Sequence, residues 1–278
     1  MSIHYSHTST VGHPMKKAQL ALFSILFLLA SKVYSQTVTL AVEAVYPKEQ
    51  AAYVYEPLKQ WLEKKTGVTV NIQSADNYYF YWRSAQSNEP DFTLDASHVA
   101  AYRINEKNYI PLARVQEDIS YHLISNFEPA DGQSISEFLV GNKVVTLPSP
   151  NLGSILFDQW FTDLFLQPQK VVTALSWEDV IEQVFAQSAD AAIIPSSLFK
   201  LYPNFVSLKE SKPYPGLTLL ASPNTSPQLR DSFKNAILAI GTDDESFDIL
   251  AELNSDGFTE INIDDYKGLE EILTKILY

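Results

Sequence analysis

Hydrophobic residues recur at helical spacing in the segment Glu56–Val70, EPLKQWLEKKTGVTV. Leu58, Trp61 and Leu62 fall on one side of a helix, and lysines and glutamates occupy the other side. This pattern predicts an amphipathic helix. Gly67 can end the helix in a left-handed cap, and the alternation of valines and polar residues that follows predicts a strand.

The next segments continue the alternation of strands and helices. A helix is expected over Tyr78–Ser87. Tyr78, Tyr81 and Trp82 share one face of it, Tyr79 and Arg83 share another, and one face must be buried against a sheet. The order strand, helix, strand, helix, strand is how an α/β lobe begins. The strands expected in this first lobe are Val38–Val42, Val68–Ile72, Asp91–Leu94 and Leu112–Val115.

A second α/β unit follows, and the chain then returns to the first lobe through Gly216–Ala221. The other strands expected are Ile119–Ser125, Lys143–Leu147 and Ala189–Ile194. The helices expected are Ser134–Leu139, Gly153–Leu166, one that Ser176 caps, Pro227–Ile240, Glu245–Leu253 and Asp264–Leu277. The pattern therefore predicts lobe I over residues 36–117 and 222–278, and lobe II over residues 118–221. Two crossings between lobes make a cleft that closes by hinge motion.

Residues 1–35 have the pattern of an N-terminal extension and a secretion signal. Lys16 and Lys17 form a basic region, Leu20–Ala30 forms an apolar run, and Val33–Ser35 offers small residues before Gln36. A membrane anchor is the alternative, but a span needs about 20 apolar residues. We expect export to the periplasm with cleavage before Gln36, and a start at either Met1 or Met15.

Composition narrows the classes of partner and chemistry. The three lysines before Gln36 leave 17 basic residues against 33 acidic ones, a net charge of −16. Such a balance disfavours nucleic acid and anionic membranes as partners. The chain has no cysteine and, after cleavage, only His98 and His122, so we expect no metal and no cofactor. No G-x-S-x-G, H-E-x-x-H, P-loop or G-x-G-x-x-G motif is present, which disfavours an enzyme.

Several ordered segments resemble the phosphonate, phosphite and phosphate substrate-binding proteins of ABC transporters. They are EPLKQWLEKKTGVTV, the tyrosine-rich run from Asn77, the strand DFTLD, and the ending NSDGFTEINIDDYKGLEEIL. The resemblance implies an α/β, two-lobed type II periplasmic binding protein fold with the ligand cleft between the lobes. It also implies a monomer that binds a small solute and docks on an ABC permease. A periplasmic sensor subunit of the same fold, which presents its ligand to a membrane signalling protein, is the alternative.

The resemblance places ligand contacts at loops that follow strands. Tyr78 matches a tyrosine that faces the ligand in the family, and Asp95 stands where relatives have an aromatic or small residue. The stretch Ser149–Ser154 replaces a hydroxyl-rich loop, and Trp177 replaces a histidine. The residues expected to line the cleft are Tyr78, Asp95, Asn151, Ser154 and Trp177, with Tyr46 and Ser196 as weaker candidates.

Three interpretations of these departures stay open. Trp177 and Asp95 can simply pack or face solvent in a protein with other ligand chemistry. Tyr78, Tyr79, Trp177 and Asp95 can form an aromatic, acidic cage for a cationic or zwitterionic solute. Backbone N–H groups at a helix start can also retain a phosphonate or phosphate.

Overall fold

A computed structural model describes residues 1–5, 36–242 and 244–274 of the chain. The expected secretion signal falls on residues 6–35 and thus lies outside the described residues. The described residues from Gln36 onward belong to one compact unit. Among the described residues, no helix has both the length and the apolar character that crossing a bilayer requires.

Lobe I is built on a six-stranded mixed sheet in the order β11-β4-β10-β3-β1-β2. Strand β1 pairs in parallel with β2 and β3, whereas β10 runs antiparallel to β3 and β4. Parallel pairing places the carboxyl ends of β1 and β3 at the same edge of the sheet. The strands are β1 Thr37–Val42, β2 Thr69–Gln73, β3 Phe92–Asp95, β4 Ile110–Val115, β10 Thr218–Ala221 and β11 Phe258–Thr259.

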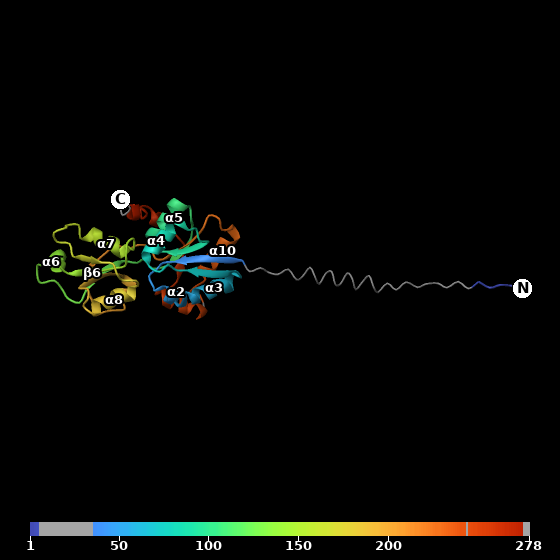
Figure 1. Ribbon diagram of the computed structural model, residues 1–278, viewed down its shortest axis with the longest axis horizontal. Helices are drawn as coiled ribbons and strands as arrows, with labels where there is room; N and C mark the ends of the chain where they lie inside the picture. The colour runs from blue at the N-terminus through green and yellow to red at the C-terminus, as the bar shows by residue number, and fades with distance from the viewer. Residues whose placement is uncertain (6–35, 243, 275–278) are drawn as a thin grey trace. The chain divides into compact units, whose positions relative to one another are not determined.

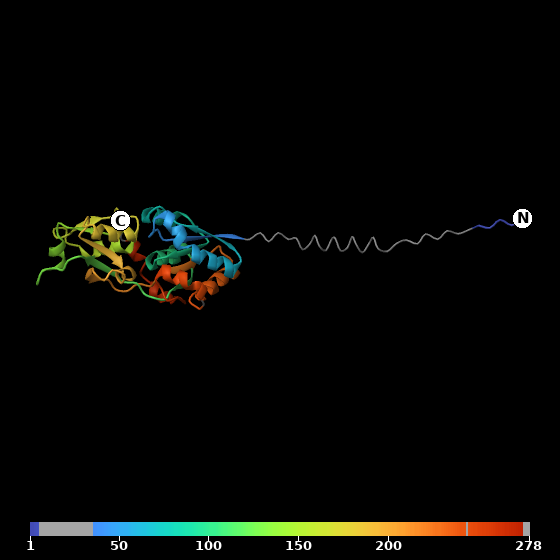
Figure 2. The same ribbon diagram turned by 90° about the horizontal axis from the view of Figure 1, so that it is seen from below.

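Helices cover both faces of this sheet, as Figures 1 and 2 show. On one face, the predicted helix α3 (Glu56–Thr66) buries Leu58, Trp61 and Leu62, and the Trp61 indole N–H donates to the Ala236 carbonyl of α10 at 2.7 Å. Gly67 ends α3 at φ 74°, as expected. The other helices of lobe I are α2 Lys48–Val54, α4 Tyr78–Ser87, α5 Ser97–Lys107, α10 Pro227–Leu238, η1 Asp244–Ser246, α11 Phe247–Leu253, η2 Ile263–Tyr266 and α12 Glu271–Thr274.

Lobe II is built on a five-stranded sheet in the order β7-β6-β8-β5-β9. Alternate residues of β8 enter two different cores: Ala191 and Ile193 pack on the side of α7, and Ala192 and Ile194 on the side of α8. Both faces of this sheet are therefore buried. The strands are β5 Tyr121–Ser125, β6 Lys143–Val145, β7 Gln169–Val171, β8 Ala191–Pro195 and β9 Val206–Glu210, and the helices are α6 Ile135–Leu139, α7 Leu152–Trp160, α8 Trp177–Phe185 and α9 Ser196–Phe199.

Two crossings connect the sheets, one after β4 and one before β10. They meet in an antiparallel bridge in which Ile119 and Tyr214 exchange N–H···O=C bonds of 2.8 and 2.9 Å. The crossings approach so closely at Gly216 that an added Cβ would lie 2.5 Å from the Glu117 carbonyl oxygen. Because β10 pairs within the sheet of lobe I, the chain has returned to lobe I by Thr218, before the boundary we predicted after Ala221.

Two of the predicted helices were too long. The helix expected to reach Leu166 ends at Trp160, because the Asp163 side chain accepts the Phe165 N–H in a turn that competes with helix. The helix expected from Asp264 is broken by Gly268 at φ 79°, which separates η2 from α12. The sequence pattern also did not identify α2 or strand β9.

Candidate ligand-binding site

A cavity of about 480 Å³ lies between the two lobes, beside the two crossings. Its walls come from residues just after β1, β3, β4 and β8, and from the first residues of α5, α7, α8 and α9. This placement follows from the topology, since the carboxyl ends of parallel strands and the starts of the next helices share one edge of each sheet. The cavity has the size of a pocket for a small solute.

Glu43 supplies a carboxyl group to the inner wall of the cavity. It follows β1 directly, is 6% exposed, and lines the cavity beside Ala96 and Ser97 at the start of α5. The Tyr78 hydroxyl donates to Glu43 Oε1 at 2.8 Å, and the Ala96 backbone N–H also donates to the carboxyl. Burial raises the pKa of Glu43 to about 7, and these two donors only partly offset that rise.

Aromatic rings form two of the cavity walls. Tyr121 and Trp177, from lobe II, have ring centroids 6.3 Å apart with the planes tilted by 55°. Tyr46 and Tyr55, from lobe I, pack edge to face with centroids 6.2 Å apart. Their π-faces give the site a surface that suits apolar groups and cations.

The charges around the cavity are mostly negative. Among the described residues that line it, the acidic side chains are Glu43, Glu117, Asp118, Glu178 and Glu252, and Lys200 is the only basic one. Two of the acids are committed elsewhere. Asp118 forms an ion pair with Arg114, and Glu117 accepts hydrogen bonds from the Ser255 hydroxyl and the Asp256 N–H. These bonds hold the first crossing to its neighbours.

Four of the seven residues predicted from the sequence line this cavity: Tyr46, Asn151, Trp177 and Ser196. Asn151 caps α7 by accepting the Gly153 N–H at 2.9 Å. Trp177 begins α8, and its backbone N–H donates to the Val45 carbonyl across the cleft at 3.3 Å. The Ser196 hydroxyl accepts the Ser120 N–H at 3.3 Å.

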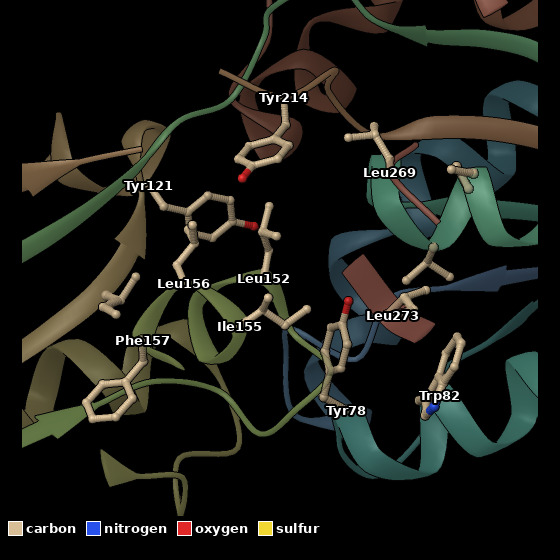
Figure 3. Close-up of a cluster of buried hydrophobic side chains, with 14 of the residues drawn as sticks. Tyr78, Trp82, Tyr121, Leu152, Ile155, Leu156, Phe157, Tyr214, Leu269 and Leu273 are labelled. Atoms are coloured by element: carbon tan, nitrogen blue, oxygen red, sulfur yellow. The ribbon is translucent and has the colours of Figure 1, made fainter. Parts of the chain in front are cut away.

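The other three predicted residues, Tyr78, Asp95 and Ser154, do not line the cavity. Tyr78 lies behind Glu43 and orients it through the hydrogen bond above. Ser154 is buried in α7, and its hydroxyl makes no hydrogen bond within the described part of the chain. In Figure 3, Tyr78 of α4 lies beside Ile155 of α7, within the apolar cluster that both lobes share.

Asp95 ends β3 as predicted, but its carboxyl is fully buried and turned to a cation of its own lobe. Its Oδ2 lies 2.8 Å from the Arg103 Nε of α5, and it also accepts hydrogen bonds from the Tyr81 and Thr93 hydroxyls. A buried charge must be paired, so the Asp95 carboxylate serves the stability of lobe I through its ion pair with Arg103.

Acidic and aromatic residues line the cavity, but Tyr78, Tyr79 and Asp95 are not among them. Tyr79 is 57% exposed and packs on Phe80, so it cannot join Tyr78 in a cage. Glu43, rather than Asp95, is the acid after a parallel strand that lines the cavity, and Tyr121 also lines it. The signal for Glu43 was its position as an acid immediately after the first parallel strand.

Asp95→Asn should lower the free energy of unfolding by about 3–5 kcal/mol, because it leaves the buried Arg103 charge without a carboxylate. Equilibrium denaturation in urea measures the change. The matched control is Asp158→Asn, whose carboxyl is 57% exposed and pairs with Lys170, and its cost should stay below about 1 kcal/mol. Equal, small costs for both variants would contradict this account of Asp95.

Glu43→Gln should change the pH dependence of stability. As pH rises from 4.5 toward 7, the unfolded carboxyl is ionised while the native one still holds its proton, so Glu43 makes the wild type progressively less stable. The stability of the variant relative to wild type should therefore grow over this interval, by roughly 3 kcal/mol at most.

His98 affects the pH dependence of stability with the opposite sign. Burial lowers its pKa to about 4, so its contribution to the free energy of unfolding is lost as pH falls below 6.5. It is present in both proteins and cancels in the difference. Urea denaturation at several pH values gives that difference, and a value that is constant with pH would contradict the burial of an ionisable Glu43.

Comparison with known proteins identifies the family. Residues 40–266 match the model of the family described as "ABC transporter, phosphonate, periplasmic substrate-binding protein". A comparison with curated protein sequences finds no match.

Three solved structures show the same fold at low sequence identity. The PhnD1 protein of Prochlorococcus marinus, in complex with methylphosphonate, superimposes with a TM-score of 0.73 at 14% identity, covering 87% of this chain and 99% of its own. A binding protein component of an ABC phosphonate transporter from Pseudomonas aeruginosa gives 0.69 at 14%, covering 86% and 85%. A Xanthomonas citri protein bound to ATP gives 0.65 at 12%, covering 87% and 98%.

These findings confirm the expected α/β, two-lobed type II periplasmic binding protein fold with a cleft between the lobes. The family consists of substrate-binding proteins and not of enzymes. The chain therefore belongs to the periplasmic substrate-binding protein family of phosphonate ABC transporters.

Proposed function

We propose that this protein captures a small solute in the periplasm and delivers it to an ABC importer, through ligand contacts that differ from those of an oxyanion site. The family supports the first part, since its members are periplasmic substrate-binding proteins of ABC transporters. One observation carries the second part: Glu43, a buried acid, lines the cavity.

A phosphonate group would meet this carboxyl at short range. Two like charges about 4 Å apart repel by roughly 4 kcal/mol at the effective dielectric constant typical near a protein surface. A neutral Glu43 would remove that repulsion, but most of the carboxyl is ionised above its pKa of about 7. The start of α5, which could otherwise attract an anion, already donates the Ala96 N–H to Glu43.

The proposed ligand contacts follow the cavity. Tyr46, Asn151, Trp177 and Ser196 keep the role predicted from the sequence, and Glu43 joins them. Tyr121 and Ser97 complete the inner wall. Tyr78, Asp95 and Ser154 become supporting residues, because they lie behind the surface that a solute can touch.

The protein would act as a monomer after removal of its secretion signal before Gln36, and its partners would be the solute and the permease. The sensor role has the same fold, and no feature of the described residues favours it. Permease and ATPase genes beside this gene would support import, and a membrane sensor gene in their place would support signalling.

A thermal-shift screen of the protein from Gln36 tests the proposal. The panel pairs phosphate, phosphite and methylphosphonate with choline, betaine, amino acids and neutral sugars. A ligand at about a hundred times its dissociation constant adds roughly 2.7 kcal/mol to stability, which a melting curve resolves.

We expect at least one small solute to raise the melting temperature and the three phosphorus oxyanions to leave it unchanged. A shift with the oxyanions would overturn the altered contacts. If no solute in the panel raises the melting temperature, the proposed role in solute capture is wrong.

A further inference from the structure

The inner wall of the cavity combines one buried carboxyl with aromatic rings from both lobes. We propose that the cleft recognises the ammonium group of a small organic cation or zwitterion, with Glu43 as its counter-ion and Tyr121 and Trp177 as its aromatic wall. This inference rests on the proposed function and names the solute class of that same cleft.

The first argument is the charge that Glu43 leaves uncompensated. Its hydrogen-bond donors, the Tyr78 hydroxyl and the Ala96 N–H, are both neutral. The neighbouring acid Asp95 already has its cation in Arg103, whereas no ion pair holds Glu43 within the described residues. A buried carboxylate without a cation is costly, and an ammonium ion from the solute would remove that cost.

The contrast between Glu43 and Asp95 indicates that the ligand supplies the cation that Glu43 lacks. Asp95 ends β3, Glu43 follows the parallel neighbour β1, and both residues are buried. Asp95 does not line the cavity, and Arg103 of α5 pairs with it. Glu43 points to the cavity, where the basic side chain of the wall is the exposed Lys200 of the α9 region.

The aromatic rings give the second, independent argument. Tyr121 and Trp177 stand in the same cavity wall with centroids 6.3 Å apart, and Tyr46 and Tyr55 form a second pair. The face of a Trp or Tyr ring attracts a cation by about 0.5–2 kcal/mol, more where water is excluded. The ring faces repel an oxyanion, which could use only the hydroxyl and indole N–H donors of these side chains.

Binding of a cation must displace the proton that Glu43 holds below neutral pH. The groups within electrostatic range of Glu43 are Tyr55, Tyr78, Tyr81, Tyr121 and Asp95. Burial raises the pKa of all four tyrosines, so they stay neutral, and Asp95 stays paired with Arg103. Affinity for a cation should therefore rise between pH 5.5 and pH 8 and follow the ionisation of Glu43, whose pKa is about 7.

Isothermal titration calorimetry at pH 8 on the protein from Gln36 tests the inference. The probes are choline, betaine and ethanolamine, with methylphosphonate as the anionic comparison. Glu43→Gln removes the charge and keeps the shape, and Trp177→Ala removes an aromatic face. The matched control is Glu128→Gln, which makes the same charge change at an exposed position outside the cavity.

We expect at least one of the three ammonium probes to bind the wild type and methylphosphonate to give no heat of binding. Glu43→Gln should weaken that probe by about tenfold or more, and Trp177→Ala by a few-fold or more. Glu128→Gln should bind like the wild type. Because Glu43→Gln relieves a buried charge, the variant should fold, and its melting curve checks this.

Three results would overturn the inference: no ammonium probe binds the wild type, Glu43→Gln binds as tightly as wild type, or Glu128→Gln weakens binding as much as Glu43→Gln. If the solute screen nevertheless finds an uncharged ligand, the role in solute capture stands and only the assignment of an ammonium group falls. If no solute binds, both the role in solute capture and the assignment of an ammonium group are wrong.

Discussion

The antiparallel bridge between Ile119 and Tyr214 is the constraint on which the cleft depends. It fastens the two crossings together at the point where the chain leaves the sheet of lobe I and where it returns. Gly216 permits this approach, since a side chain there would collide with the Glu117 carbonyl. The cavity lies beside these crossings, and residues that follow strands of both sheets line it.

Two carboxyls at this edge of the lobe I sheet differ in what surrounds them. Asp95 and Glu43 follow or end neighbouring parallel strands, but Asp95 meets Arg103 inside lobe I and Glu43 meets the cavity. The first is a structural ion pair whose loss costs stability. The second is a buried carboxyl without a cation beside it, and burial raises its pKa to about 7.

Much of the fold could be predicted from the sequence because its elements obey local rules. The apolar face of α3 and its Gly67 cap, and the Ser176 cap of α8, each depend on residues a few positions apart. The predictions failed at the ends of two helices. Asp163 accepts the Phe165 N–H in a turn just beyond the end of α7, and Gly268 separates α12 from η2.

Part of the candidate site could be predicted from local patterns. Asn151 and Trp177 could be placed at helix starts and Ser196 after a strand, and all three line the cavity. The side toward which a strand-end carboxyl turns depends on a partner from another element, Arg103 for Asp95 and Tyr78 for Glu43. The sequence contains both pairs, but nothing local links their members.

The most direct measurement is the pKa of the Glu43 carboxyl, followed by carbon NMR in the protein from Gln36, with Glu43→Gln to assign the signal. A buried carboxyl that awaits a cation predicts a midpoint near 7 in the free protein. The midpoint should fall when choline or another bound ammonium solute is added. A midpoint near the ordinary value of 4.5 in the free protein, or one that a bound solute leaves unchanged, would contradict the account.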